Sequence, residues 1–198
     1  TGRSMRMPFN GLTLLDYAIN ASLALTYVVL QRHDRAGLIV SAYNKITAVQ
    51  ASNNRSQLHR IMKQLFDLET DFPESDFGYL QSGLRQKVSQ RSLIILFTNF
   101  ESKDALFRQL QGLQAIAKNH LLLVVGFMNT ELESMLDEPT KIVRDVYDKA
   151  IAEHMILEKK RIQYELKQRG ILSLLVTPQE LNIKLINKYL EIKSRSLL

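Results

Sequence analysis

The side chains best placed to bind a ligand follow a short apolar run near the middle of the chain. Residues 93–97 are Leu, Ile, Ile, Leu and Phe, and Thr98 and Asn99 come directly after them. An unbroken apolar run of this length is typical of a strand buried on both faces of a parallel sheet. Because ligands bind beside the carboxyl ends of such strands, the sequence predicts a site at Thr98 and Asn99.

Residue patterns typical of catalysis are weak elsewhere. The histidines are scattered, and we expect them on the surface or at element ends: His33, His59, His120 and His154. Four acidic residues follow a second apolar run, where acid–base chemistry is conceivable but solvated loop carboxylates are the ordinary case: Glu131, Glu133, Asp137 and Glu138. No G-x-S-x-G, P-loop or G-x-G-x-x-G motif occurs. We therefore expect a protein that is not an enzyme and has no small-molecule substrate.

The charge of the chain is basic but mixed. The net charge is +6 and the pI is near 9.5, yet acidic residues alternate with basic ones almost throughout. The basic run at 158–161 lies beside Glu153 and Glu165, which predicts a solvated, ion-paired helix face. Only Tyr164 offers an aromatic ring there for stacking, so nucleic acid is not an expected partner.

The composition of the chain excludes several further classes of site and protein. Apolar residues make up 45% of the 198 residues and charged residues 23%, as in ordinary globular proteins. The absence of cysteine removes disulfides, thiol catalysis and Cys-based zinc sites. The apolar runs fall short of the ~20 residues of a spanning helix, and no signal peptide is evident, so we expect no membrane contact by this chain.

Hydrophobic periodicity predicts alternating helices and strands. A loop covers 1–13, and loops at 70–76 and 131–139 separate later elements, the last of these being a loop or a short helical turn. Helices are expected over 14–33, 57–68, 77–90, 103–118 and 140–169, with a closing helix that begins at Thr177-Pro178. Strands are expected over 36–41, 93–97, 121–127 and 171–176, with 46–50 as an antiparallel edge strand.

This order predicts a single α/β domain over residues 1–198, with a doubly wound, mostly parallel sheet and helices on both faces. The helix at 14–33 has no strand before it, although the first strand of such a sheet usually lies in its middle. We therefore expect a first strand upstream of Thr1 and interpret the chain as a fragment of a longer protein. Direct pairing of the strands at 36–41 and 93–97 would contradict that interpretation.

Several motifs together resemble a large bacterial family of unknown function. Its members carry a von Willebrand factor A-like domain and are often encoded beside MoxR-type AAA+ ATPases. The resemblance covers nearly the whole chain and rests on these stretches: Thr1–Met5, Gly11–Ala18, Asp34–Leu38, Arg91–Asn99, Asn119–Val125, Val176–Pro178 and Leu185–Lys193.

The resemblance implies a degenerate metal site. Domains of this type hold Mg²⁺ through an Asp-x-Ser-x-Ser loop, a Thr from a later loop and an Asp after a later strand, all hard oxygen ligands. The first Asp would precede Thr1, Gly2 replaces the first Ser, and Ser4 matches the second. Ser75 is the match for the Thr, and Asn99 stands in place of the last Asp. Since Gly2 offers no hydroxyl and Asn99 offers no negative charge, we expect weak Mg²⁺ binding at best.

The function that the resemblance implies is protein–protein recognition, with a MoxR-type AAA+ ATPase as the expected partner. Arg3, Arg6, Asn99 and Asn129 are the expected contacts, the arginines receiving an acidic side chain through bidentate hydrogen bonds. The expected location is the cytoplasmic face, with an upstream segment as a membrane anchor. The alternative is a metal-dependent hydrolase that uses the same sheet edge, which would require acidic ligands that this sequence has largely lost.

Overall fold

The computed structural model describes residues 1–198 except 43–44, 67, 69–75, 138, 140–141 and 197–198. The amino-terminal region holds a short 3₁₀ helix η1 (Arg3–Met5) and a small hairpin of β1 (Pro8–Phe9) and β2 (Leu12–Thr13), where the sequence predicted only a loop. Asn10 and Gly11 have φ angles of 48° and 81°. Since both residues of a type I′ turn need positive φ, Asn-Gly explains the hairpin.

The next element, α1 (Leu14–Gln31), begins at a capping box. The Thr13 hydroxyl accepts a hydrogen bond from the Asp16 amide, and the Asp16 carboxylate accepts one from the Thr13 amide at 2.7 Å. By length and composition α1 reaches what a membrane span needs, with a mean hydropathy of 1.3, contrary to the expectation from its sequence. The core helix of a soluble protein passes the same test, and five buried apolar residues of α1 belong to the core.

The strands form separate ladders in the described part of the chain. Strand β3 (Ala36–Ala42) pairs antiparallel with β4 (Lys45–Ser52), which confirms the predicted edge strand. Strands β5 (Leu93–Phe97), β6 (Leu121–Phe127) and β7 (Leu172–Val176) form a parallel sheet in the order β5-β6-β7. This confirms a mixed α/β fold with a parallel sheet.

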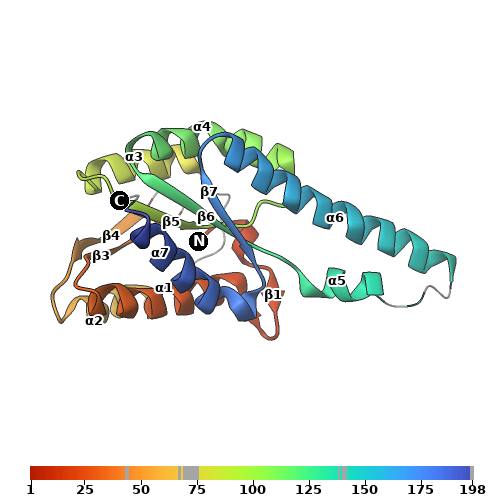
Figure 1. Ribbon diagram of the computed structural model, residues 1–198, viewed down its shortest axis with the longest axis horizontal. Coiled ribbons are helices and arrows are strands. Elements are labelled where there is room, and N and C mark those ends of the chain that lie inside the picture. The colour runs from red at the N-terminus through yellow and green to blue at the C-terminus, as the bar shows by residue number, and fades with distance from the viewer. Residues whose placement is uncertain (43–44, 67, 69–75, 138, 140–141, 197–198) are drawn as a thin grey trace.

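Helices cover both faces of the strands (Figure 1). On one face α1, α2 (Gln57–Phe66) and α7 (Leu181–Ser194) share a core with Leu123, Val125 and Phe127 of β6. On the other, α3 (Phe77–Lys87), α4 (Lys103–Asn119) and α6 (Val143–Gln168) share a core with Leu122 and Val124. The alternation along β6 therefore supplies two cores from one strand.

The two ladders contribute to the same pair of cores without pairing with each other. Leu38 of β3 and Ile95 of β5 pack against the α1 side, and Ile39 and Ile94 pack against the α3 side. Among the described residues, β3 and β5 are not paired with each other. Their direct pairing would have contradicted the expected further strand, so that expectation stays open. All five residues of β5 are only partly buried, whereas its sequence predicted a strand enclosed on both faces. The reason is that β5 lies at an edge of its ladder.

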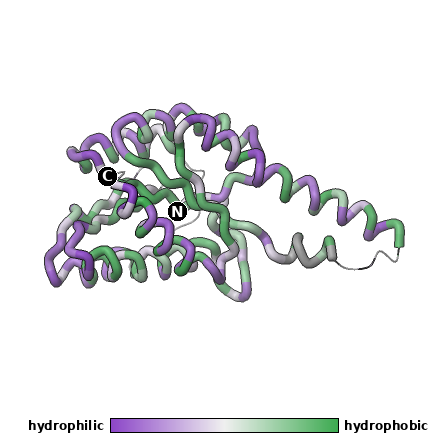
Figure 2. Tube along the Cα trace, in the orientation of Figure 1, coloured by the Kyte–Doolittle hydropathy of each residue, from purple (hydrophilic) through white to green (hydrophobic). Residues whose placement is uncertain are grey.

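One part of the chain projects beyond the sheet. After β6, the short helix α5 (Thr130–Asp137) and the amino-terminal half of α6 extend away from the sheet (Figure 1). Figure 2 shows hydrophobic positions recurring along this part of α6. The closing segment is a 3₁₀ turn η2 (Pro178–Glu180) that leads into α7.

Candidate functional site

The predicted site residues Thr98 and Asn99 lie where β5 ends. Each is 5% exposed, and the Thr98 amide donates a hydrogen bond to the Val125 carbonyl at 3.0 Å, which continues the parallel ladder by one residue. The chain then leaves the sheet, and Ser102 caps α4 by accepting a hydrogen bond from the Ala105 amide. Asn99 is thus held at the carboxyl edge by regular structure on both sides.

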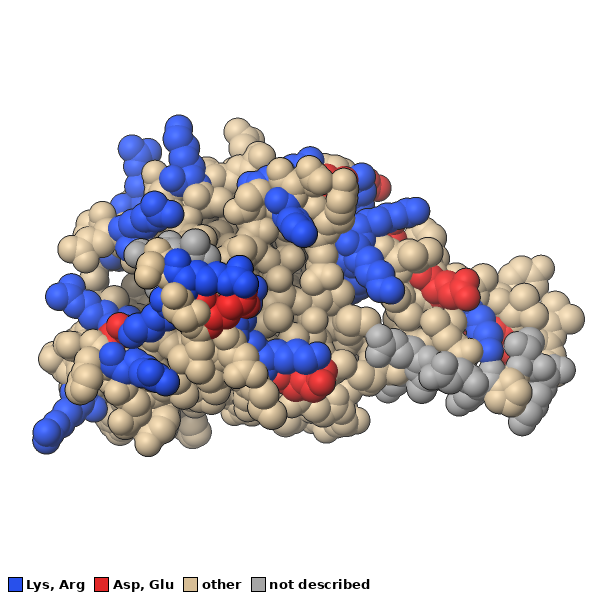
Figure 3. All heavy atoms as spheres, in the orientation of Figure 1, with Lys and Arg blue, Asp and Glu red and all other residues tan. Residues whose placement is uncertain are grey.

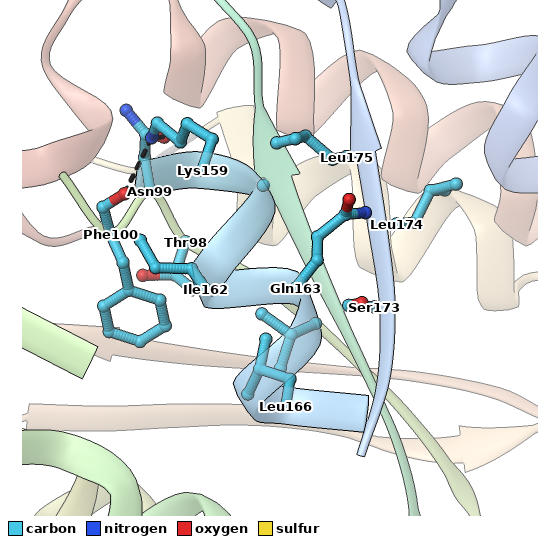
Figure 4. A pocket seen from close by; sticks show the side chains of 12 residues that line it. Thr98, Asn99, Phe100, Lys159, Ile162, Gln163, Leu166, Ser173, Leu174 and Leu175 are labelled. Carbon is cyan, nitrogen blue, oxygen red and sulfur yellow. Dashed lines mark hydrogen bonds between the residues drawn. The ribbon is translucent and has the colours of Figure 1, made fainter. Parts of the chain in front are cut away.

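The partner of Asn99 is a lysine that the sequence did not single out. The Lys159 ammonium donates a hydrogen bond to Asn99 Oδ1 and another to the Phe100 carbonyl oxygen at 2.7 Å (Figure 4). Lys159 lies three residues before Ile162 and seven before Leu166, both buried, so it shares their helix face. This spacing is the signal that could have separated Lys159 from the solvated run around it.

Burial changes the acidity of this lysine. Loss of hydration disfavours the ammonium and lowers the pKa of Lys159 from 10.5 to about 8, while the negative charge of Glu101 acts in the opposite direction. At neutral pH the side chain still carries its charge. A half-buried cation therefore stands at the carboxyl edge of the sheet.

A small cavity lies beneath α6 next to this group. It is lined by Thr98, Gly126 and Ser173 from the strand side and by Ile162, Gln163 and Leu166 from the helix side. The lining is mostly uncharged, with Lys159 at one end (Figure 4). Nothing in it resembles a nucleophile paired with a base.

The rest of the basic run behaves as its sequence predicted. Glu158 accepts hydrogen bonds from the Lys103 amide and from Arg161, each at 3.0 Å, and these lower the pKa of its carboxyl. Glu165 pairs with Lys103 at 2.7 Å and with Arg169. In Figure 3 the acidic side chains in view likewise lie beside basic ones. The ion-paired face is confirmed, but Lys159 turns away from it toward the sheet.

The other predicted site residues are spread along the carboxyl edge and the amino terminus. Ser4 is half-buried within η1, Arg3 and Arg6 are exposed beside it, and Asn129 is half-buried between β6 and α5. Ser75 lies outside the described residues, as do the side chains of Glu131, Glu133, Asp137 and Glu138. His120, expected at an element end, does lie between α4 and β6, but it is only 8% exposed, and burial lowers its pKa.

The donor set does not fit Mg²⁺. No group of three or more His, Asp or Glu side chains suitable for a metal occurs among the described residues. Asn99 Oδ1, one of the expected ligands, already accepts a hydrogen bond from a positive charge. Because Mg²⁺ requires several hard oxygen ligands, these residues supply too little to hold it.

The fold and this site define an α/β domain with a polar site at the carboxyl edge of a parallel sheet. Residues 6–165 match the family described as "Protein of unknown function DUF58", and the chain belongs to that family. The match includes β5, Asn99 and Lys159. No curated protein matches the chain.

Proposed function

We propose that the protein is a non-catalytic protein–protein interaction domain that docks its partner on the α6 arm, defined as residues 143–157. Val143, Tyr147 and Ile151 are 73%, 69% and 58% exposed. They are spaced four residues apart, so they line one face of the helix. Soluble proteins rarely leave large apolar side chains clustered in solvent unless that surface binds something. This exposed apolar row is the observation that carries the proposal.

The partner that we propose is a MoxR-type AAA+ ATPase, and the sheet edge supplies a second contact. Arg3 and Arg6 are exposed and can form bidentate hydrogen bonds with carboxylates of a partner. Asn99 is nearly buried and bonded to Lys159, so in this proposal it holds the edge in shape. Asn129 lies where the chain passes from β6 to α5, which links the sheet edge to the α6 arm.

We also propose the finer fold, a von Willebrand A-like sheet with one further strand between β3 and β5. Two features support it: both strands send alternate side chains to the same two cores, and neither pairs with the other. A parallel strand in that position would join the ladders into the single sheet expected of a doubly wound fold.

The test is calorimetric titration of the protein with a purified MoxR-type ATPase encoded beside its gene. The double variant Tyr147→Asp, Ile151→Asp should weaken binding at least about tenfold, because it places charges in the apolar contact. Tyr164→Asp is the matched control, since Tyr164 is 61% exposed on the same helix outside the α6 arm. Unchanged affinity in the double variant, with a loss in Arg3→Glu, Arg6→Glu, would place the contact at the sheet edge alone. No binding by the wild type would exclude this partner.

A further inference from the structure

We propose that the protein binds a membrane surface of anionic lipid headgroups through one end of the molecule, the basic end. Figure 1 shows α1, α3, α4 and α7 ending there, on the left of the view, where β5 and β6 begin. The α6 arm projects from the opposite side, so the inference concerns a different surface from that of the proposed function. The basic end is defined by six exposed cations: Arg32, Arg35, Arg55, Lys87, Arg91 and Lys118.

These cations stand where elements begin or end. Lys87 and Lys118 lie in the last turns of α3 and α4, and Arg91 comes shortly before β5. Ala36 of β3 pairs with Ser52 of β4, so the loops that carry Arg35 and Arg55 lie side by side. In Figure 3 several blue side chains at this end have no red side chain beside them.

The positive charge of the basic end is not neutralised by neighbouring carboxylates. None of its six cations forms an ion pair with another described residue. Residues 17–66 carry six Lys or Arg side chains and a single acidic one, Asp34, which accepts hydrogen bonds from Tyr189 and Lys193 of α7. Glu191, in the last part of α7, pairs with Lys188 and Arg195 of the same helix. The acidic groups nearby are therefore already engaged.

Helix dipoles explain only half of these cations. A cation at the carboxyl end of a helix is stabilised by the dipole, which accounts for Arg32, Lys87 and Lys118. Arg35 and Arg91 instead precede strands, and Arg55 lies just before the start of α2, where the dipole disfavours a positive charge. Exposed arginines held by neither a carboxylate nor a dipole agree with a surface that receives a negatively charged partner.

Lipid headgroups fit this surface better than nucleic acid. Both offer phosphates, which arginine binds through paired hydrogen bonds. Single-stranded nucleic acid is held on exposed aromatic rings, and a duplex by a helix or ribbon in its groove. Among the described exposed aromatic residues, the nearest in sequence to any of the six cations is Tyr27, five residues before Arg32. Because the cations come from the ends of separate elements, they match a broad anionic surface.

The test is flotation of the purified protein with phosphatidylcholine vesicles that contain about 30% phosphatidylserine, in about 0.1 M salt. The wild type should float with these vesicles and not with pure phosphatidylcholine. The bound fraction should fall steeply as the salt is raised to about 0.5 M, because exposed charges are screened. The double variant Arg35→Gln, Arg91→Gln should bind the anionic vesicles at least about tenfold more weakly.

The matched control is Arg108→Gln, Lys160→Gln, which removes the same charge from exposed positions inside α4 and α6. It should bind within about twofold of the wild type. Equal losses in the two double variants would overturn the basic end as the contact, since net charge alone would then explain binding. Failure of the wild type to float with anionic vesicles would overturn the membrane partner. Tighter binding to a DNA duplex than to vesicles of equal phosphate concentration would overturn it in favour of nucleic acid.

Discussion

At the scale of single residues, Lys159 has a consequence for stability that pH should reveal. Its pKa is about 8 in the folded chain against 10.5 for an ordinary lysine, so the unfolded chain binds this proton more tightly. Stability therefore rises with pH as the folded-state group deprotonates, and the gain is complete above pH 10.5. Below pH 8 the buried charge costs the folded state about 1–3 kcal/mol.

The variant Lys159→Met removes that dependence. The stability of Lys159→Met relative to wild type should fall by about 1–3 kcal/mol between pH 7 and pH 10, because only the wild type gains from deprotonation. Urea unfolding at pH 7, 8, 9 and 10 measures this difference in unfolding free energy. Lys160→Met is the control, for which the difference from wild type should not change with pH. If the stability difference between Lys159→Met and wild type stayed the same from pH 7 to pH 10, Lys159 would titrate as an ordinary surface lysine.

At the scale of elements, α3 and β4 approach each other through a glycine. A Cβ on Gly83 would lie 2.1 Å from Ile46 Cδ1 and 3.3 Å from Cγ1 and Cγ2 of the same side chain. Alanine is the better helix former, so in an open helix Gly83→Ala would stabilise. Here the contact with Ile46 must be relieved by displacing that side chain, and we expect a net loss of about 1–2 kcal/mol.

Shortening the neighbour should rescue the glycine variant. Ile46→Val removes the methyl group nearest the new Cβ, so the double variant should be more stable than the sum of the single changes predicts. A double-mutant cycle by urea unfolding measures this coupling, with Gly78→Ala as a control nearer the start of α3. Additive effects would show that α3 simply moves away from β4.

Local patterns predicted the elements well, because periodicity and caps act over a few residues. The strands at 93–97 and 121–127 have the predicted bounds, and α1 ends two residues before the predicted position. The fate of Lys159 was not predictable in the same way. Its neighbours in the sequence are charged, and its spacing to the buried Ile162 and Leu166 places it on their helix face. Its two oxygen partners, however, come from the packing of α6 on the sheet, which the sequence does not show. The antiparallel pairing of β3 with β4 was predicted, because the two strands are neighbours in the chain. The order β5-β6-β7 was not, since it depends on contacts between distant segments.

At the scale of the whole molecule, hydrogen exchange can test whether the edge of β5 that faces away from β6 is open to water. The Thr98 amide bonds to β6, and residues of a parallel strand alternate between their two neighbours. The amides of Ile95 and Phe97 should therefore point to the edge where no strand pairs among the described residues. Exchange with deuterium should be at least about 100-fold faster at these two amides than at Leu96 and Thr98 if that edge is open to water. Slow exchange at all four amides would instead show that another strand or segment covers this edge of β5. If that protection weakened on dilution, the covering segment would belong to a second copy of the protein; if it did not, it would belong to the same chain.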